Sequence, residues 1–288
     1  YSLLTFLIFI FLNIFDFRIF DSFNLSMSLI SSGGFLPVND LSTILNTNTK
    51  EIIFALLMLV SFFSIFLSYN LLFVSKKNIN FFQEDIYLFL YFIILIFLFF
   101  LLFNSEYNFS TILLSLTSSI SNIGVSLDQS PQNLSFVYLM LVIIGGSFFS
   151  TSSGIRFLKI YALCKFSIND LISHVRPKNI FLNSNFFLKI NFQKVEIDKY
   201  FLSVLIFIIS MFFLSSFLTF SGISLENSFK LSILTLMNTV NSSMYGIEYF
   251  NFQELQFYTK LYLIIFMIIG RVELLTLLII CKKFLFKN

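Results

Sequence analysis

Four small residues, Ser31-Ser32-Gly33-Gly34, follow an apolar segment that is only half as long as a membrane span. They offer backbone carbonyls from residues that can adopt a positive φ. Rings of such carbonyls replace the hydration shell of a cation in selectivity filters. A helix that ends just before them would add its negative end, which also favours a cation. Without the preceding half-span the same residues would indicate only a turn; after it they predict a cation filter.

The half-span occurs three times, at residues 23–35, 110–125 and 231–246. Each is too short to cross a bilayer and lies between two segments that can cross. Polar re-entrant backbone is tolerated at membrane depth only where protein buries it or where it lines a water-filled cavity. We therefore expect short helices whose tips, at residues 31–35, 121–125 and 238–243, assemble a pore from repeated helix–loop–helix units.

The composition requires a membrane. The chain has 288 residues, of which 57% are hydrophobic and 11% are charged, and its mean hydropathy is +0.90, whereas a soluble domain carries roughly a quarter charged residues. Six segments are long enough to span, which predicts an all-α polytopic membrane protein. They are residues 3–15, 52–74, 86–103, 134–166, 200–220 and 257–284.

Positive charge gives the spans a direction. Thirteen of the 18 Lys and Arg residues lie at or after the ends of the second, fourth and sixth spans, which places that side in the cytoplasm. The three units then share one orientation, so they are parallel repeats and conflict with an inverted-repeat transporter. The polar stretch 174–199 between two units is either a short cytoplasmic hairpin or a plain connecting loop.

The fourth span is too long for one straight helix. Its 33 residues would make about 50 Å of helix, against a hydrocarbon core of roughly 30 Å. Its middle contains two glycines, then hydroxyl residues and a third glycine. One interpretation is a small-residue face for helix packing. We favour a break, with helix over residues 134–144, non-helical backbone over 147–153 and helix again before Lys159.

Four motifs resemble one family. Gly145-Gly-Ser-Phe-Phe-Ser-Thr-Ser-Ser-Gly-Ile-Arg156 resembles the Gly-Gly-x-x-Gly-Ser-Thr-x-Gly-Gly-Ile-Lys motif of the TrkH/KtrB (Trk/Ktr/HKT) potassium-transporter family. Gly270-Arg-Val-Glu-Leu-Leu-Thr276 resembles its Gly-Arg-Leu-Glu-x-x-Thr motif. Ser32-Gly-Gly-Phe35 is similar to its Thr-Gly-Gly-Phe filter, and His174-Val-Arg-Pro177 to its Val-His-Pro loop. Order and spacing agree along nearly the whole chain.

The resemblance implies a potassium-channel-like arrangement of four membrane–pore–membrane units, of which this sequence shows the last three. They are expected at residues 1–74 (the second unit, with its start truncated), 86–166 and 200–286, with a cytoplasmic connector at 167–199. It also implies that potassium, or sodium, is the transported ion and is taken up across the bacterial inner membrane. The implied partners are membrane lipid, a second copy in a homodimer and a TrkA/KtrA-like nucleotide-binding regulatory subunit in the cytoplasm.

The resemblance also assigns site residues. The ion filter would comprise Ser31, Ser32, Gly33, Gly34, Ser121, Asn122, Ile123, Gly124, Asn238, Thr239, Val240 and Asn241. The gate would comprise Gly145, Gly146, Ser147, Ser150, Thr151, Gly154 and Arg271. In the third loop Asn241 stands where the family has its filter glycine. Asparagine is the non-glycine residue that best tolerates the left-handed region, which would preserve a carbonyl ring.

Arg271 is the charge placed deepest in a span. Such a charge costs at least about 2.5–3.5 kcal/mol and faces the bundle interior with a partner, unless the side chain snorkels to the membrane surface. A desolvated guanidinium needs acceptors, and a broken helix supplies free carbonyls. We therefore expect Arg271 near the backbone of residues 147–153, and the resemblance implies that it faces the pore below the filter.

Other classes of function fit less well. A non-conducting anchor subunit of an energy-transducing complex would carry intramembrane Lys, Glu or His relays, and this sequence has almost none. The carboxylates form no acid–base pair, the two cysteines have no metal-ligand spacing and there is no nucleotide loop. The sequence thus favours transport over catalysis, and predicts no cofactor, no metal beyond the transported cation and no nucleic-acid partner.

Overall fold

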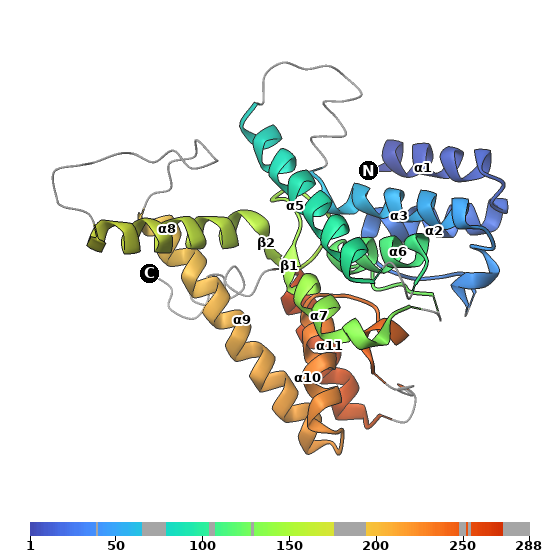
Figure 1. Cartoon of the computed structure of the whole chain (residues 1–288). Coiled ribbons are helices and arrows are strands. Elements are labelled where there is room, and N and C mark those ends of the chain that lie inside the picture. Colours follow the sequence, from blue (N-terminus) through green and yellow to red (C-terminus); the bar gives the residue numbers. More distant parts are fainter. Residues whose placement is uncertain are drawn as a thin grey trace.

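A computed structural model of the chain consists almost entirely of helices (Figure 1). It describes residues 1–38, 40–64, 79–103, 107–127, 130–175, 194–247, 252 and 255–272. In this part of the chain the exceptions are two short strands, β1 (Ile144–Gly145) and β2 (Ile155–Arg156), which pair in parallel. The predicted all-α class is confirmed.

The helices follow the order that three repeated units require. They are α1 (Ser2–Ile14), α2 (Ile19–Ser31), α3 (Asn48–Phe62), α5 (Ile79–Phe103), α6 (Phe109–Ile120), α7 (Ser135–Ile143), α8 (Phe157–Val175), α9 (Lys194–Phe220), α10 (Leu225–Leu236) and α11 (Phe257–Val272). Short 3₁₀ turns lie at Leu41–Thr43, Gln132–Leu134 and Ser243–Tyr245.

The three half-spans are short helices, as predicted. Helices α2, α6 and α10 have 13, 12 and 12 residues, which is about 18–20 Å at 1.5 Å per residue. A membrane core is roughly 30 Å thick, so none of them can cross it. They end at Ser31, Ile120 and Leu236, directly before the predicted filter loops.

Helix α6 is rich in hydroxyl residues and yet is buried along residues 110–120. Buried hydroxyls need acceptors, and three of them donate to the backbone one turn earlier. These bonds run from Ser115 Oγ to Thr111 O (2.9 Å), from Thr117 Oγ1 to Leu113 O (2.9 Å) and from Ser119 Oγ to Ser115 O (2.8 Å). These bonds satisfy part of the hydroxyl content of the helix, while Ser110 Oγ and Ser118 Oγ have no hydrogen-bond partner among the described residues.

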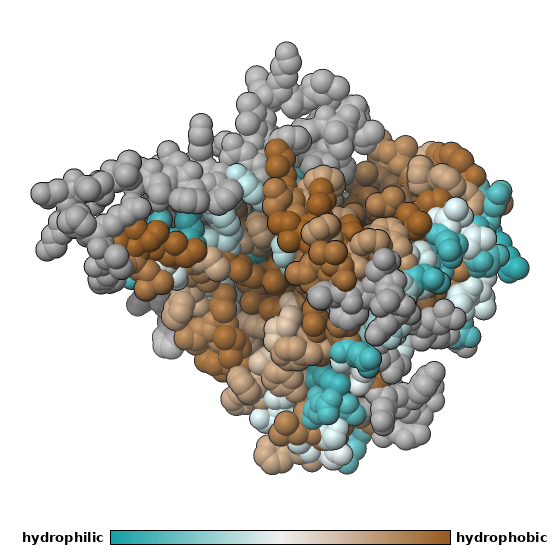
Figure 2. All heavy atoms as spheres, in the orientation of Figure 1, coloured by the Kyte–Doolittle hydropathy of each residue, from teal (hydrophilic) through white to brown (hydrophobic). Residues whose placement is uncertain are grey.

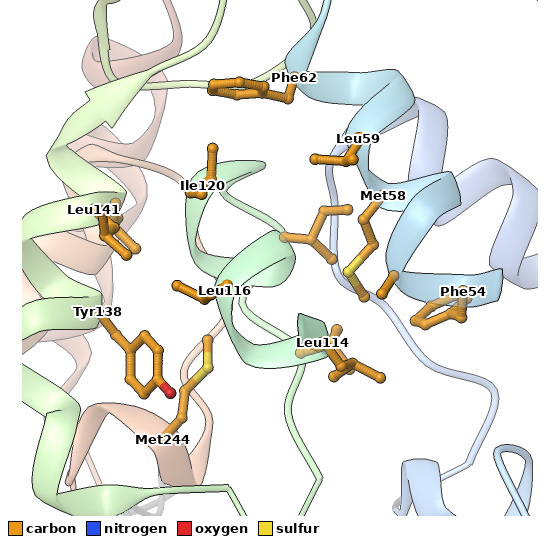
Figure 3. Close-up of a cluster of buried hydrophobic side chains, with 14 of the residues drawn as sticks. Phe54, Met58, Leu59, Phe62, Leu114, Leu116, Ile120, Tyr138, Leu141 and Met244 are labelled. Atoms are coloured by element: carbon orange, nitrogen blue, oxygen red, sulfur yellow. The ribbon is translucent and has the colours of Figure 1, made fainter. Parts of the chain in front are cut away.

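Apolar side chains hold α6 between α3 and α7 (Figure 3). Met58 of α3 and Leu114, on the side of α6 facing α3, are fully buried, as is Tyr138 of α7. Because cores are packed like crystals, these contacts fix the axial position of α6. They consequently fix the point at which the second filter loop begins.

Apolar side chains also cover much of the surface. Figure 2 shows hydrophobic residues across the middle of the face shown, with hydrophilic residues gathered toward its edges. Within the described residues two helices are long and apolar enough to cross a membrane, with spans at Glu84–Leu101 and Val195–Phe220. Only 28% of each hydropathy window is buried, so most of these side chains face outward.

The connector predicted at residues 167–199 is described only at its two ends. Helix α8 continues to Val175, past the predicted end of its span at Phe166, and α9 begins at Lys194 rather than at Tyr200. Both additions carry charged residues, so a helix can extend beyond the apolar stretch that reveals it in a sequence. The hairpin considered for residues 174–199 lies mostly outside the described residues.

Candidate functional site: three filter loops and an inter-strand loop

The three short helices end in the same backbone motif. In each, the second N–H after the last turn bonds the carbonyl five residues earlier, and the residue before that N–H is left-handed, as in a Schellman motif. The bonds are Gly33 N to Ser28 O (3.0 Å), Ile123 N to Ser118 O (3.1 Å) and Thr239 N to Leu234 O (2.9 Å). The left-handed residues are Ser32, Asn122 and Asn238, with φ of 48°, 59° and 52°.

Two residues further on, the loops differ. Gly34 and Gly124 have φ of 65° and 81°, but Val240, the equivalent position in the third loop, is not among the described residues with a positive φ. Neither is Asn241. Asn241, which the resemblance places at the filter glycine, is therefore not left-handed. The left-handed asparagine is Asn238, because the Schellman motif sets the register from the helix end.

The filter loops meet at one place. A Cβ atom built on Gly34 would overlap Ile123 O and lie 2.7 Å from Val240 Cγ2, and one built on Gly124 would overlap Val240 O. Val240 N also donates to Ile123 O (3.4 Å). The negative ends of α2, α6 and α10 thus lie at a common point, which is an electrostatic arrangement that favours a cation.

A lysine supports the outer end of the third loop. Lys230 Nζ donates to Gly246 O (3.0 Å) and lies 2.7 Å from Glu226 Oε1, one turn earlier on α10. Hydrogen bonding and the positive charge of Lys230 lower the pKa of the exposed Glu226 carboxyl. The lysine thereby connects the start of α10 to the chain leaving the filter.

The predicted break in the fourth span is confirmed. Helix α7 ends at Ile143 and α8 begins at Phe157. Between them, Ile144 pairs with Ile155 and Gly145 with Arg156, so the chain closes a loop over residues 146–154, which we call the inter-strand loop. Of the predicted gate residues, Gly145 lies in β1 and the other loop members, up to Gly154, lie between the strands.

Arg156 holds the inter-strand loop from inside. Its Nη1 lies 3.0–3.2 Å from Ser150 Oγ and from the carbonyls of Ser147, Ser150 and Ser152. Nη1 carries two protons, so the arginine that ends the motif donates to carbonyls that the helix break leaves free. The sequence pointed to Arg271 for this task, and Arg271 instead reaches the loop through a side chain, Ser153 Oγ.

Backbone bonds join the inter-strand loop to the end of α3. Ser147 N donates to Phe62 O and Ser152 N to Ser61 O, both at 3.1 Å. Thr151 Oγ1 lies 3.3 Å from the same Ser61 carbonyl. The last turn of α3 lacks intrahelical partners for its carbonyls, so the loop completes that helix end.

Two buried carboxylates, which the sequence analysis did not select, support the same region. Glu84 Oε1 accepts from Phe148 N (3.1 Å) and Asp85 Oδ1 accepts from Ser64 N (3.0 Å). Glu84 and Asp85 are 3% and 2% exposed. The signal that could have found them is an acidic pair at the start of an apolar span, since buried carboxylates need partners.

Arg271 lies between the inter-strand loop and the first filter loop. Its Nη1 donates to Ser153 Oγ (3.0 Å) and lies 3.4 Å from Ser32 Oγ, and its Nη2 lies 3.3 Å from Ser31 O. The guanidinium therefore reaches residue 153 of the loop by its side chain, and the backbone acceptors it uses belong to the filter. It is near the site that the sequence predicted, with different partners.

The fold is that of an all-α polytopic membrane protein. The family model described as TrkH, cation transport protein, matches residues 125–286. This range is more than half of the chain, so the chain belongs to the TrkH family of cation transport proteins, as the motifs predicted.

A solved structure shows the same fold. The chain is similar to the crystal structure of the potassium transporter TrkH from Vibrio parahaemolyticus, with a TM-score of 0.79 and 21% sequence identity. The match covers 96% of this chain and 61% of that chain, so this chain spans about three fifths of the transporter's length. No curated protein sequence gives a significant match.

Proposed function

We propose that the chain supplies three of the pore loops of a potassium-conducting pore in the bacterial inner membrane. The convergence of the three filter loops, each on the negative end of a short helix, carries this proposal. Backbone carbonyls at such a point can replace the hydration shell of K⁺. Sodium is the alternative ion. A carbonyl site separates K⁺ from Na⁺ by its geometry and its field strength.

The inter-strand loop would act as the gate. It lies beside the first filter loop, to which Arg271 and Thr151 connect it. Among the described residues, three further bonds join it to the end of α3 and one joins it to Glu84. A loop of this kind can change position without disrupting the packed helices. The positive charge of Arg271 would oppose the passage of a cation while the loop is in place.

Regulation would come from outside the membrane. We propose a homodimer of pores, and a cytoplasmic nucleotide-binding subunit of the TrkA/KtrA kind that moves α8 and with it the inter-strand loop. Helix α8 begins directly after β2, so a displacement of α8 reaches Arg156 within one residue.

Ion flux tests the proposed pore. Liposomes that contain the full-length protein are expected to release trapped K⁺ faster than empty liposomes do. They should release Na⁺ more slowly than K⁺. Absence of any cation flux from folded protein would contradict the pore and favour a non-conducting anchor subunit.

Arg156→Gln tests the gate. Removing the guanidinium leaves several loop carbonyls without a donor, at about 1–3 kcal/mol for a buried unsatisfied group. We expect flux without any cytoplasmic partner to rise roughly tenfold, which corresponds to ~1.4 kcal/mol. Arg18→Gln is the matched control, because Arg18 is exposed at the start of α2. Equal flux from both variants would show that the loop is not a gate.

A further inference from the structure

The three left-handed residues that follow the short helices are equivalent in backbone but differ in what their side chains bind. Each donates a hydrogen bond to a distant backbone carbonyl. The bonds are Ser32 Oγ to Thr151 O (2.9 Å), Asn122 Nδ2 to Val142 O (2.8 Å) and Asn238 Nδ2 to Met267 O (3.0 Å). Because the three donors occupy the same place in the motif, their acceptors can be compared directly.

The two asparagines bind regular helices of their own units. Val142 belongs to α7, the helix that follows the second filter loop, and Met267 belongs to α11, the helix that follows the third. Both acceptors lie before the last residue of their helix. The second and third filter loops are therefore attached to rigid parts of the fold.

Ser32 bonds a loop, whereas the two asparagines bond helices. Its acceptor, Thr151 O, lies in the inter-strand loop and belongs to another unit, 119 residues away in the sequence. Ser32 is 2% exposed, so water does not compete for the bond. The first filter loop is thus attached to the element proposed as the gate.

Arg271 reinforces this attachment. Nη1 of Arg271 is 3.4 Å from Ser32 Oγ and 3.0 Å from Ser153 Oγ. A hydroxyl has one proton and two lone pairs. When Ser32 Oγ accepts from the guanidinium, its single proton is shared between Thr151 O (2.9 Å) and the adjacent Ser31 O (2.7 Å). The guanidinium contact and the bond to Thr151 O are therefore compatible, and the loop is attached at Thr151 O and at Ser153 Oγ.

We propose that Ser32 is a positioning residue that couples the inter-strand loop to the conformation of the first filter loop. Displacement of the loop breaks the Ser32–Thr151 bond and releases the backbone around Ser31, while the second and third filter loops keep their helical anchors. Opening the gate then changes the filter on one side only, and gate position and ion preference vary together. The inference rests on the proposed function, because it assigns the gate and the filter as such.

Ser32→Ala removes the donor and keeps the small side chain, and Ser26→Ala is the matched control. Ser26 is a serine of α2 that is equally buried, and its Oγ donates within its own helix, to Phe23 O (2.8 Å). Ser32→Asn adds a third variant, which restores a donor of the type found at positions 122 and 238.

Hydrogen exchange measured by mass spectrometry on the full-length protein in nanodiscs reports the attachment itself. We expect Ser32→Ala to speed amide exchange in residues 146–154 by about three- to tenfold, as for loss of one buried hydrogen bond. Exchange in α9 should be unchanged, which shows that the variant is folded. Ser26→Ala should match the wild type.

Flux measured in liposomes reports the coupling. Ser32→Ala should raise partner-independent K⁺ flux and lower the K⁺/Na⁺ ratio together, and Ser32→Asn should restore both toward wild-type values. Faster loop exchange with an unchanged flux ratio would overturn the coupling, and so would equal behaviour of Ser32→Ala and Ser26→Ala. Absence of flux from the wild type would instead overturn the proposed function, while hydrogen exchange would still test the Ser32–Thr151 bond.

Discussion

The second and third filter loops leave their helices in the same way and differ two residues later. Both begin with a left-handed asparagine, Asn122 or Asn238. The second loop then has Gly124 at φ 81°, whereas the third has Val240, a β-branched residue for which a positive φ would be a genuine outlier. The helix end thus determines the start of the loop, and one side chain determines where its next carbonyl points.

The difference has a consequence for the whole site. Val240 N bonds Ile123 O, so in this conformation that carbonyl faces the third loop. The valine side chain also lies against Gly34 of the first loop. A cation bound at this level would require the third loop to move, and this requirement makes the three loops unequal.

The largest effect is expected from Gly124→Ala. A Cβ at this position would overlap Val240 O, and the left-handed backbone adds roughly 1–2 kcal/mol of strain for a residue with a side chain. We expect K⁺ flux in liposomes to fall at least about tenfold, as for ~1.4 kcal/mol or more.

Gly222→Ala separates the two causes. Gly222 also has a positive φ, 93°, but nothing lies within 4 Å of the position its Cβ would take. The Gly222→Ala variant should have slightly lower stability and an unchanged K⁺ flux. If Gly124→Ala were as mild as Gly222→Ala, the close contact between the second and third loops would not exist in the working protein.

Val240→Gly should remove the difference between the loops and have an intermediate effect. The third loop could then take the backbone of the second, and the side chain between the loops would be absent. We expect higher flux of K⁺ and, because the opening is wider, measurable flux of Cs⁺. Val240→Ile, which enlarges the side chain, should raise neither the K⁺ flux nor the Cs⁺ flux. Equal flux of both variants would mean that Val240 does not limit passage.

The smallest effect is expected at Asn238, where the two loops agree. Asn238→Ala keeps neither the left-handed preference nor the bond to Met267 O, whereas Asn238→Gly restores the backbone preference alone. A loss of roughly 1 kcal/mol would lower the melting temperature by about 2–4 °C. Asn238→Gly should recover most of the stability that Asn238→Ala loses. An equal loss with glycine and with alanine would show that the side-chain bond outweighs backbone strain.

Much of the fold could be predicted from the sequence. The spans, the three short helices and the break after Ile143 follow from the lengths of apolar stretches and from clusters of glycine and hydroxyl residues, which are local properties. The third loop shows the limit. Counting along the motif placed Asn241 at the glycine position, but the hydrogen bond from Thr239 N to Leu234 O sets the register one residue earlier.

The sequence by itself determined the class of protein, the repeated half-spans, the family and the position of the break, because these depend on hydropathy, length and local motifs. Only the tertiary structure decided which partners the charges take. Arg156 donates to the carbonyls of the inter-strand loop, whereas Arg271 reaches the loop through Ser153 Oγ, and Glu84 of another helix accepts from its backbone. The physical reason is that a desolvated charge bonds whichever acceptors packing brings within about 3 Å, and the packing of segments distant in sequence has no local signal.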